Sequence, residues 1–304
     1  EWQALYAAWR AANPELAAEY DRSMSRAIPD DLEEQLLAAL PAKSNATRRL
    51  SGDVIQKLAA VLPNFVGGSA DLAPSTSTLI KGGGDIGKHS FGGRNFHFGV
   101  REHAMGAILN GLALYGGLIP FGATFLVFAD YMRPPIRLAN IMGIQVIYVY
   151  THDSIFVGED GPTHQPVEQM ASLRLIPGMT VIRPADGPEV AAAWANAIRR
   201  KDGPTALILT RQSVPAIERQ EPFSFAAFNR GAYAIRSTPG REPEVILVGT
   251  GSELQLAVAA GSALEEQGYA VRVISMPSQE LYLQQDAAYR NNLSGLLVAS
   301  NLVL

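Results

Sequence analysis

Polar side chains that could carry chemistry gather in three loops, each directly after a predicted apolar strand. The loops span residues 67–75, 151–166 and 210–212. They carry Asp71, Ser75, His152, Asp160, His164 and Arg211. Because the carboxyl ends of parallel strands meet at one edge of a sheet, we expect these groups to line one site. Imidazoles and carboxylates can move protons and arginine can bind anionic oxygens, so the set predicts a ligand site.

A metal site in the second loop is an alternative. His152, His164 and Asp160 offer donor types that zinc accepts. The two histidines are twelve residues apart, and neither a close pair nor a helical His-x-x-x-His pattern supports ligation. The chain has no cysteine, which excludes disulfides, thiolate zinc sites, iron–sulfur clusters and cysteine nucleophiles. We therefore favour an organic ligand over a metal at these residues.

Two further features have both a structural and a functional interpretation. Glu102 opens an apolar stretch predicted to be a helix, and a helix dipole by itself favours an acid in the first turn. Phe125, Phe128 and Tyr131 recur every three residues, which predicts one stripe on a helix. Such a stripe belongs to the core unless a flat ligand lies against it.

Alternating helices and strands must position these groups. Helices are expected at 51–62, 101–115, 125–142 (interrupted at Pro134-Pro135) and 188–199. Strands are expected at 65–68, 145–150, 180–182 and 205–209, and a strand plus turn at about 118–124. The run QVIYVY at 145–150 is typical of a parallel strand buried on both faces. We therefore expect an α/β fold with a doubly wound, mostly parallel sheet.

The chain divides into four predicted segments. These are a helical segment at 1–44, the α/β domain at 45–220, a linker at 221–231 and a second α/β unit at 232–304. The last segment offers one strand–helix–strand unit, at 244–248, 253–267 and 270–275. So few strands cannot form a complete doubly wound domain, and we expect this second domain to be incomplete and truncated.

Composition limits the classes of partner. The 304 residues are 47% apolar and 18% charged, with a net charge of −4 and a pI of about 5.8. A mildly acidic chain without a basic block argues against general nucleic-acid binding. Residues 104–129 carry no charge, but five glycines and Pro120 divide them, so we expect no membrane span. No secretory signal opens the sequence, and a reducing, cytoplasmic setting is expected.

Five segments together resemble transketolase, a family of thiamine-diphosphate enzymes. They are GGSADLAPS (67–75), FGVREHAMGAILNGLALYGG (98–117), FGATFLVFADYMR (121–133), THDSIFVGEDGPTHQPVEQMASLR (151–174) and LTRQSVP (209–215). They follow one another in order between residues 67 and 215. The resemblance implies that 45–215 is a pyrimidine-binding middle domain. It also implies that the residues from 232 begin a C-terminal domain and that the first 44 form a helical linker.

The resemblance implies thiamine diphosphate as the cofactor. Glu102 matches the glutamate that hydrogen-bonds ring nitrogen N1′ of the aminopyrimidine. This contact favours the imino tautomer, whose 4′-nitrogen removes the C2 proton, and such a glutamate must be buried. Phe125, Phe128 and Tyr131 match the aromatic pocket around the pyrimidine, and Asp71 matches an acidic residue close to the cofactor.

Sugar phosphates are the substrates that the resemblance implies. The groups that match the phosphate clamp are Arg48, Ser75, His152 and Arg211. Asp160 matches the residue that recognises the C2 hydroxyl, and His164 matches a histidine that assists proton transfer near the reacting carbonyl. The family reaction moves a two-carbon ketol unit from a ketose phosphate to an aldose phosphate, with the cofactor supplying the difficult electronics.

The family's diphosphate site has no good match here. That site uses Gly-Asp-Gly and, about twenty-five residues later, Asn to hold the diphosphate with Mg²⁺ or another divalent cation. The nearest match is Gly84-Asp85-Ile86 with Asn110, which lacks the second glycine and places the asparagine inside a predicted helix. We judge this match accidental. We expect no metal ligands in this chain, and a dimer in which a chain carrying the missing domain completes the site.

Two other hypotheses remain open. The chain could be a non-catalytic, truncated module that only associates with a transketolase. It could also be a related thiamine-diphosphate enzyme, such as a deoxyxylulose-phosphate synthase or the β subunit of a ketoacid dehydrogenase. The loop GEDGPTHQP (158–166) together with TRQ (210–212) favours transketolase over both relatives.

Overall fold

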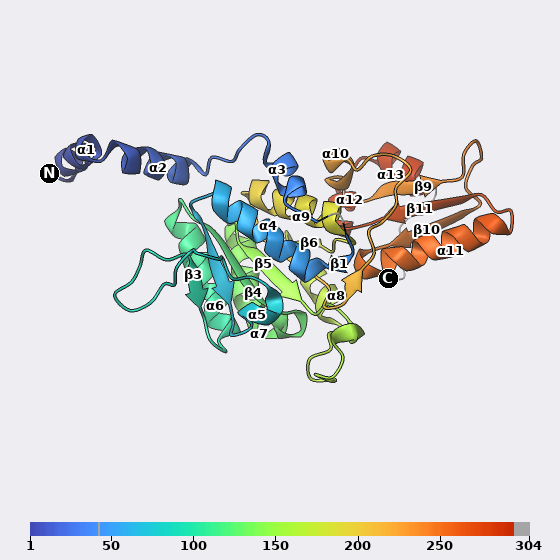
Figure 1. Ribbon diagram of the computed structural model, residues 1–304, viewed down its shortest axis with the longest axis horizontal. Helices are drawn as coiled ribbons and strands as arrows, with labels where there is room; N and C mark the ends of the chain where they lie inside the picture. The colour runs from blue at the N-terminus through green and yellow to red at the C-terminus, as the bar shows by residue number, and fades with distance from the viewer. Residues whose placement is uncertain (42, 295–304) are drawn as a thin grey trace.

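A six-stranded parallel sheet forms the centre of the computed structural model, which describes residues 1–41 and 43–294. Its strand order is β3-β2-β4-β5-β7-β6 (Figure 1). The strands are β2 (Phe65–Ser69), β3 (Asn95–His97), β4 (Ile119–Phe125), β5 (Ile147–Thr151), β6 (Thr180–Ile182) and β7 (Thr205–Ile208). Every neighbouring pair is parallel. The predicted doubly wound α/β fold is therefore confirmed.

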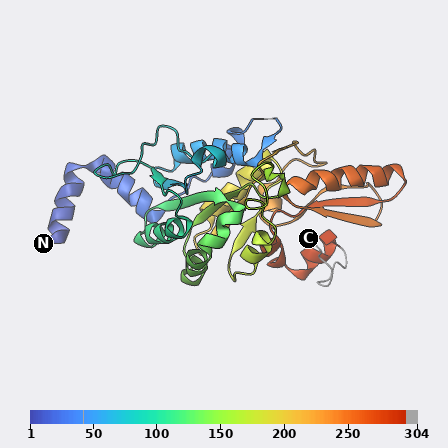
Figure 2. The same cartoon turned by 90° about the horizontal axis from the view of Figure 1, so that it is seen from below.

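Helices cover both faces of this sheet. One face carries α3 (Leu32–Ala38), α4 (Thr47–Val61) and α9 (Gly187–Arg199). The other carries α6 (Glu102–Tyr115), α7 (Ala129–Met142) and the short α8 (Gln169–Arg174). Figure 2 shows the second unit at the opposite end of the molecule from the N-terminal helices α1 (Trp2–Ala12) and α2 (Pro14–Ser25). The predicted helical character of the first segment is confirmed.

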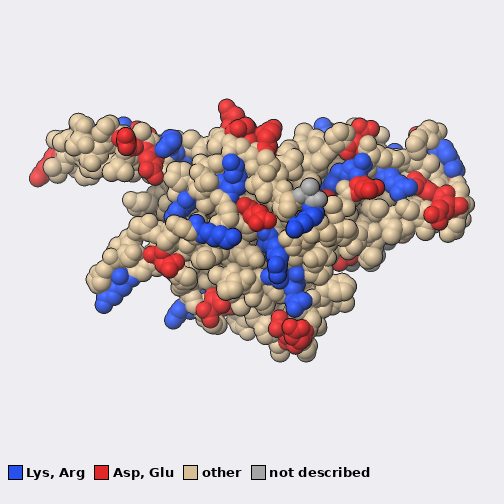
Figure 3. Space-filling model, in the orientation of Figure 1, with Lys and Arg blue, Asp and Glu red and all other residues tan. Residues whose placement is uncertain are grey.

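Basic side chains gather on the face of the molecule that Figure 3 shows. Figure 3 shows Lys and Arg gathered across the middle of this face, over α4. The first turn of α4 contributes Arg48 and Arg49. A chain of net negative charge thus concentrates positive charge near the loops that the sequence singles out.

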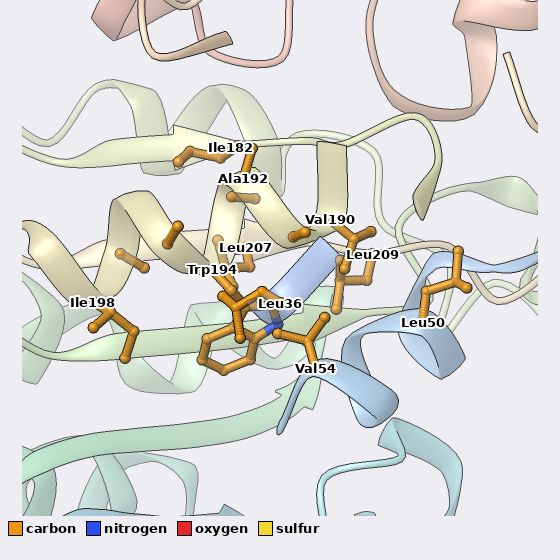
Figure 4. Close-up of a cluster of buried hydrophobic side chains, with 14 of the residues drawn as sticks. Leu36, Leu50, Val54, Ile182, Val190, Ala192, Trp194, Ile198, Leu207 and Leu209 are labelled. Atoms are coloured by element: carbon orange, nitrogen blue, oxygen red, sulfur yellow. The ribbon is translucent and has the colours of Figure 1, made fainter. Parts of the chain in front are cut away.

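Alternation along the strands divides the core into two layers. Ile147 and Val149 of β5 face α4 and α9, whereas Tyr148 and Tyr150 face α6 and α7. Trp194 of α9 lies in the first layer among Leu36, Val54 and Leu207 (Figure 4). Its indole Nε1 donates a hydrogen bond to Ser51 Oγ at 2.8 Å, which satisfies the buried N–H. The strong apolar runs of the sequence are therefore explained by burial on both faces.

Helix α7 differs from its prediction. Phe125 ends strand β4, a 3₁₀ turn η1 (Leu126–Phe128) follows, and α7 then runs through both prolines to Met142. The expected interruption at Pro134-Pro135 is wrong. Pro135 is buried against Gly106 of α6, and Asn110 Nδ2 donates a hydrogen bond to the Pro135 carbonyl at 2.9 Å. This packing holds the helix through a pair that local preference would use as a helix end.

The two ends of the α/β domain meet. Strand β1 (Asn45–Ala46) pairs antiparallel with β8 (Ser213–Val214). Beside them, the Thr47 and Thr210 hydroxyls each accept the other residue's backbone N–H, at 2.8 and 2.9 Å. Entry to and exit from this domain therefore lie side by side.

The second unit is a three-stranded sheet with helices. Strands β10 (Val245–Gly249) and β11 (Val271–Ser275) are parallel, joined through η3 (Gly251–Glu253) and α11 (Leu254–Glu266). β9 (Tyr233–Ser237), which the sequence analysis missed, pairs antiparallel with β11. Two short helices follow, α12 (Gln279–Leu283) and α13 (Ala287–Ser294). Residues 295–304 of the predicted truncated domain lie outside the described residues.

Two other predictions concern single segments. The predicted linker at 221–231 contains helix α10 (Phe225–Phe228), whose Phe228 is buried in the core. The uncharged run 104–129 is divided among α6, β4 and η1. Within the described part of the chain, none of the helices is both long and apolar enough to cross a membrane.

Candidate functional site

The parallel sheet brings the three polar loops to one edge, and Arg48 joins them. This half-buried guanidinium, on the first turn of α4, donates hydrogen bonds to the backbone carbonyl of Ser75 and, at 3.4 Å, to that of Arg211. Burial, followed by the charges of Arg49 and Arg211, lowers the pKa of Arg48. Cationic groups that repel one another at a sheet edge favour an anion between them. Three of the four groups predicted to bind phosphate therefore lie together.

His152 is the fourth of these groups. It directly follows β5 and is buried with a left-handed φ of 59°. Its imidazole stacks on Phe125 with 3.6 Å between ring centroids, and its Nδ1 lies 2.8 Å from Thr151 Oγ1. Burial, and then the charges of Arg48 and Arg211, lowers the pKa of His152 to about 3. The ring is therefore neutral near pH 7 and can take part in a hydrogen bond with an anion held by the arginines.

The aromatic residues form a row, although they do not share one helix. Phe125 ends β4, Phe128 belongs to η1 and Tyr131 lies on α7, so the predicted helical stripe is wrong. Neighbouring rings in the row are 6.1 Å apart in both pairs. The side chain of Tyr131 is 63% exposed, which leaves one end of the row open to a partner or ligand.

His164 lies against the same row. Its ring meets that of Phe128 edge-on at 5.4 Å, and its Nδ1 is 2.8 Å from Thr163 Oγ1. Two histidines from one loop thus contact the aromatic row at different rings. This arrangement places proton-transfer groups beside a flat apolar surface.

Glu102 is the first residue of α6 and is only 9% exposed. A Cβ on Gly106 would lie 2.7 Å from Pro135 Cγ, so the first turns of α6 pack closely on α7. Helices that follow parallel strands on one face begin at the same edge of the sheet. Glu102 and the aromatic row therefore share the carboxyl edge, as the resemblance implies.

Asp71 and Asp160 lie on exposed loops. Asp71 has a left-handed φ of 63° and borders a hollow of about 450 Å³ that also contacts Ser69, His97 and Gly99. Asp160 follows the short η2 turn (Ile155–Val157), and its neighbour Glu159 pairs with Arg211 at 3.6 Å. Over residues 1–41 and 43–294, no hydrogen bond or ion pair links Asp160 to the other predicted site residues.

A metal centre finds no support in the geometry. Among the described residues, no three His, Cys, Asp or Glu side chains cluster closely enough to hold an ion. Asp85 pairs with His97 at 2.9 Å on the surface, whereas Asn110 is buried against α7. These surroundings give no sign of a shared diphosphate site.

The sequence analysis missed Arg183, which contacts the residue that follows His152. Its guanidinium binds Asp153, the residue after His152, and also Glu253 of the second unit. Residues so distant in sequence show no spacing pattern. The one available signal is an acid next to a site histidine at the end of an apolar strand.

Comparison with known proteins identifies the family of this chain. Residues 43–216 match the transketolase pyrimidine-binding domain, and residues 231–298 match the transketolase-like C-terminal domain. The chain belongs to the transketolase family. A transketolase of Geobacillus stearothermophilus is 50% identical over 304 residues, which are 100% of this chain and 46% of that protein. The chain therefore spans less than half the length of the curated relatives it matches.

Solved transketolases share the fold. The enzyme of Leishmania mexicana superposes with a TM-score of 0.89 at 44% identity, over 96% of this chain and 43% of that one. A Pichia stipitis transketolase in complex with sedoheptulose-7-phosphate gives a TM-score of 0.88 at 39% identity, over 96% and 44%. A protein described as a split gene transketolase, an inactive β4 tetramer, gives 0.63 at 28% identity, over 77% and 72%.

Proposed function

We propose that this chain supplies the pyrimidine-side half of a transketolase active site. In this role it binds thiamine diphosphate and sugar phosphates together with a chain segment that holds the diphosphate and its divalent cation. The observation that carries the proposal is the buried Glu102 at the same sheet edge as the aromatic row. The intact phosphate-binding set at that edge favours catalysis over a module that only associates.

The residues present fit the pyrimidine end of the cofactor. When bound, thiamine diphosphate supplies the acidic carbon whose anion makes and breaks the carbon–carbon bond. Phe128 and Tyr131, the more exposed rings of the row, offer flat faces against which a pyrimidine can lie, with the buried Phe125 behind them. Glu102 would provide a largely buried carboxyl group for a hydrogen bond with ring nitrogen N1′. Asp71 borders the adjoining hollow, close to the place proposed for the cofactor.

The substrate end fits a sugar phosphate. Arg48 and Arg211 supply two fixed positive charges, Ser75 supplies a hydroxyl, and the neutral His152 completes the hydrogen bonds. In this proposal His164 moves a proton near the reacting carbonyl and Asp160 binds the C2 hydroxyl, the roles that the resemblance implies for them. The complex of the Pichia stipitis enzyme with sedoheptulose-7-phosphate supports this substrate class.

An exposed apolar face supports the need for a partner. Leu138 and Ile141 of α7 are 52% and 66% exposed, and Ile108 and Leu114 of α6 are exposed as well. An apolar face of this kind marks a protein interaction site more often than free surface. The split gene transketolase offers a precedent for half-length chains in this family, and the tetramer described for it is inactive. We propose a dimeric, cytoplasmic assembly.

Reconstitution tests the proposal. The chain is mixed with the N-terminal part of the Geobacillus stearothermophilus transketolase that it does not cover, with Mg²⁺ and thiamine diphosphate. Ketol transfer from sedoheptulose-7-phosphate to an aldose phosphate is measured. We expect turnover in the mixture and none with either part alone. A stable but inactive complex would support the association-only hypothesis, and tight cofactor binding by the chain alone would contradict a divided site.

A further inference from the structure

The backbone at His152 needs support from outside its own loop. A left-handed φ is uncommon for a residue with a side chain and persists where neighbouring structure holds it. Thr151 on one side is fixed where β5 pairs with β4, opposite Phe125. Asp153 on the other side has left the strand, so a different contact must fix it.

Arg183 supplies that contact. Its Nε and Nη2 donate hydrogen bonds to Asp153 Oδ2 at 3.0 and 2.7 Å. The Asp153 side chain is fully buried and that of Arg183 is 8% exposed. A guanidinium that donates twice to one buried oxygen fixes both position and direction.

The other end of Arg183 is enclosed by the second unit. Nη1 donates to the Thr250 carbonyl at 3.0 Å and to the Glu253 carboxylate, and Nη2 donates to Ser252 Oγ at 3.2 Å. Gly251 has a φ of 54°, and a Cβ there would lie 2.6 Å from Arg183 Cγ. The turn before α11 therefore closes around the guanidinium and leaves it no room to move.

We propose that Arg183 is a positioning residue through which the second unit holds His152 in the phosphate site. The inference rests on the proposed function only for what His152 binds. Burial raises the pKa of Asp153 and Arg183 opposes that rise, so without Arg183 the carboxylate would either take up a proton or turn toward water. Either change moves the residue beside His152 and loosens its stack on Phe125.

A second contact between the two units provides a matched control. Glu189 of α9 accepts hydrogen bonds from Tyr233 Oη at 2.8 Å and from Ser275 Oγ at 2.6 Å. Arg219 pairs with Asp186 in the same cluster at 2.7 Å. Tyr233→Phe therefore weakens the docking of the second unit without touching the residues around His152.

The test follows the imidazole Cε1–H signals of the five histidines by NMR, with His152 assigned from a His152→Asn variant. In the native chain the ring current of Phe125 shifts the His152 signal upfield, because the two rings are stacked. We expect Arg183→Lys and Asp153→Asn to remove this shift, and Tyr233→Phe to keep it. Inorganic phosphate, titrated as the probe, should bind the first two variants about tenfold more weakly, the size of one lost hydrogen bond.

An unchanged His152 signal in the Arg183 and Asp153 variants would overturn the inference, as would an equal change in Tyr233→Phe. If a buried variant fails to fold, Glu253→Gln is used, since the Glu253 side chain is 42% exposed. The same two outcomes then decide. Phosphate that leaves the native His152 signal unmoved counts against the proposed phosphate site alone, because the Phe125 stack is read without any ligand.

Discussion

A buried histidine between two arginines sets part of the acid sensitivity of this protein. The pKa of His152 is lowered from 6.5 to about 3, first by burial and then by Arg48 and Arg211. Above about pH 6.5 the imidazole is neutral in both the folded and the unfolded chain. Between about pH 6.5 and about pH 3 the unfolded chain binds a proton that the folded chain does not. The free energy of unfolding therefore decreases as the pH is lowered through this window.

His152→Asn removes this contribution. Asparagine tolerates the left-handed backbone, so the variant is expected to fold. As the pH is lowered through this window, the free energy of unfolding of the variant should increase relative to that of the native chain, by up to about 1.4 kcal/mol per pH unit. Urea unfolding between pH 7 and pH 4.5 measures the difference. His89→Asn is the control, because His89 has a φ of 65° but is exposed, and an equal gain there would contradict the assignment.

Glu102→Gln tests the carboxyl group proposed to contact the cofactor. The amide keeps the size of the side chain but removes the group that shares a proton with the pyrimidine. In the reconstituted mixture, ketol transfer should fall by about 10²- to 10⁴-fold, the range of acid–base catalysis. Glu266→Gln at the exposed end of α11 should retain full activity. Native turnover in the Glu102 variant would exclude the proposed role.

Individual site residues differ in how far the sequence predicts them. The resemblance identifies Arg48 and Arg211, and in the structure Arg48 Nε donates a hydrogen bond to the backbone carbonyl of Arg211. Local spacing misassigned Phe125, since a period of three also arises where a strand, a turn and a helix follow one another. Arg183 was missed because its partners are distant in sequence.

The contact between α6 and α7 positions Glu102 relative to the aromatic row, and two glycines of α6 test it. Gly106→Ala should lower the free energy of unfolding by about 1–3 kcal/mol, because the added Cβ would lie 2.7 Å from Pro135. Gly111→Ala on the same helix meets nothing within 4 Å and should raise it by about 0.5–1 kcal/mol. Urea unfolding of both variants checks the pair. Equal changes in the free energy of unfolding would mean that the close contact of Gly106 with Pro135 does not hold α6 against α7.

The sequence predicted most strands of the central sheet but missed β3. Strand β5 lies within two residues of its predicted bounds, because its buried, β-branched run is distinctive. The three-residue strand β6 lies at its predicted bounds, Thr180–Ile182. Strand β3 has three residues and borders the sheet, so little apolar patterning marks it. The path of α7 through Pro134-Pro135 depends on Gly106, which is distant along the chain, so local preference could not predict it.

For the whole molecule, the proposed completion of the site by a partner assigns an interface to the exposed apolar residues of α6 and α7. Leu138→Asp and Ile141→Asp should leave the fold intact, because both side chains are already largely exposed. Each should weaken association with the N-terminal part of the Geobacillus enzyme about 100-fold, because a charge would be buried in the interface. Sedimentation velocity of the mixtures measures this.

Leu256→Asp is the matched control. Leu256 is 64% exposed on α11, in the second unit. This variant should associate as the native chain does. Equal loss of association in all three variants would place the partner elsewhere or indicate a general loss of solubility.

The pairing of β1 with β8 brings the two boundaries of the α/β domain together. Because the chain enters and leaves at one antiparallel pair, the two boundaries are separated by hydrogen-bonding distance rather than by the width of the domain. Domains built in this way tolerate insertion into other chains and relocation of their ends. A gene could therefore be divided or fused before this domain without altering the sheet edge, whereas division after β8 would remove the residues of the second unit that enclose Arg183.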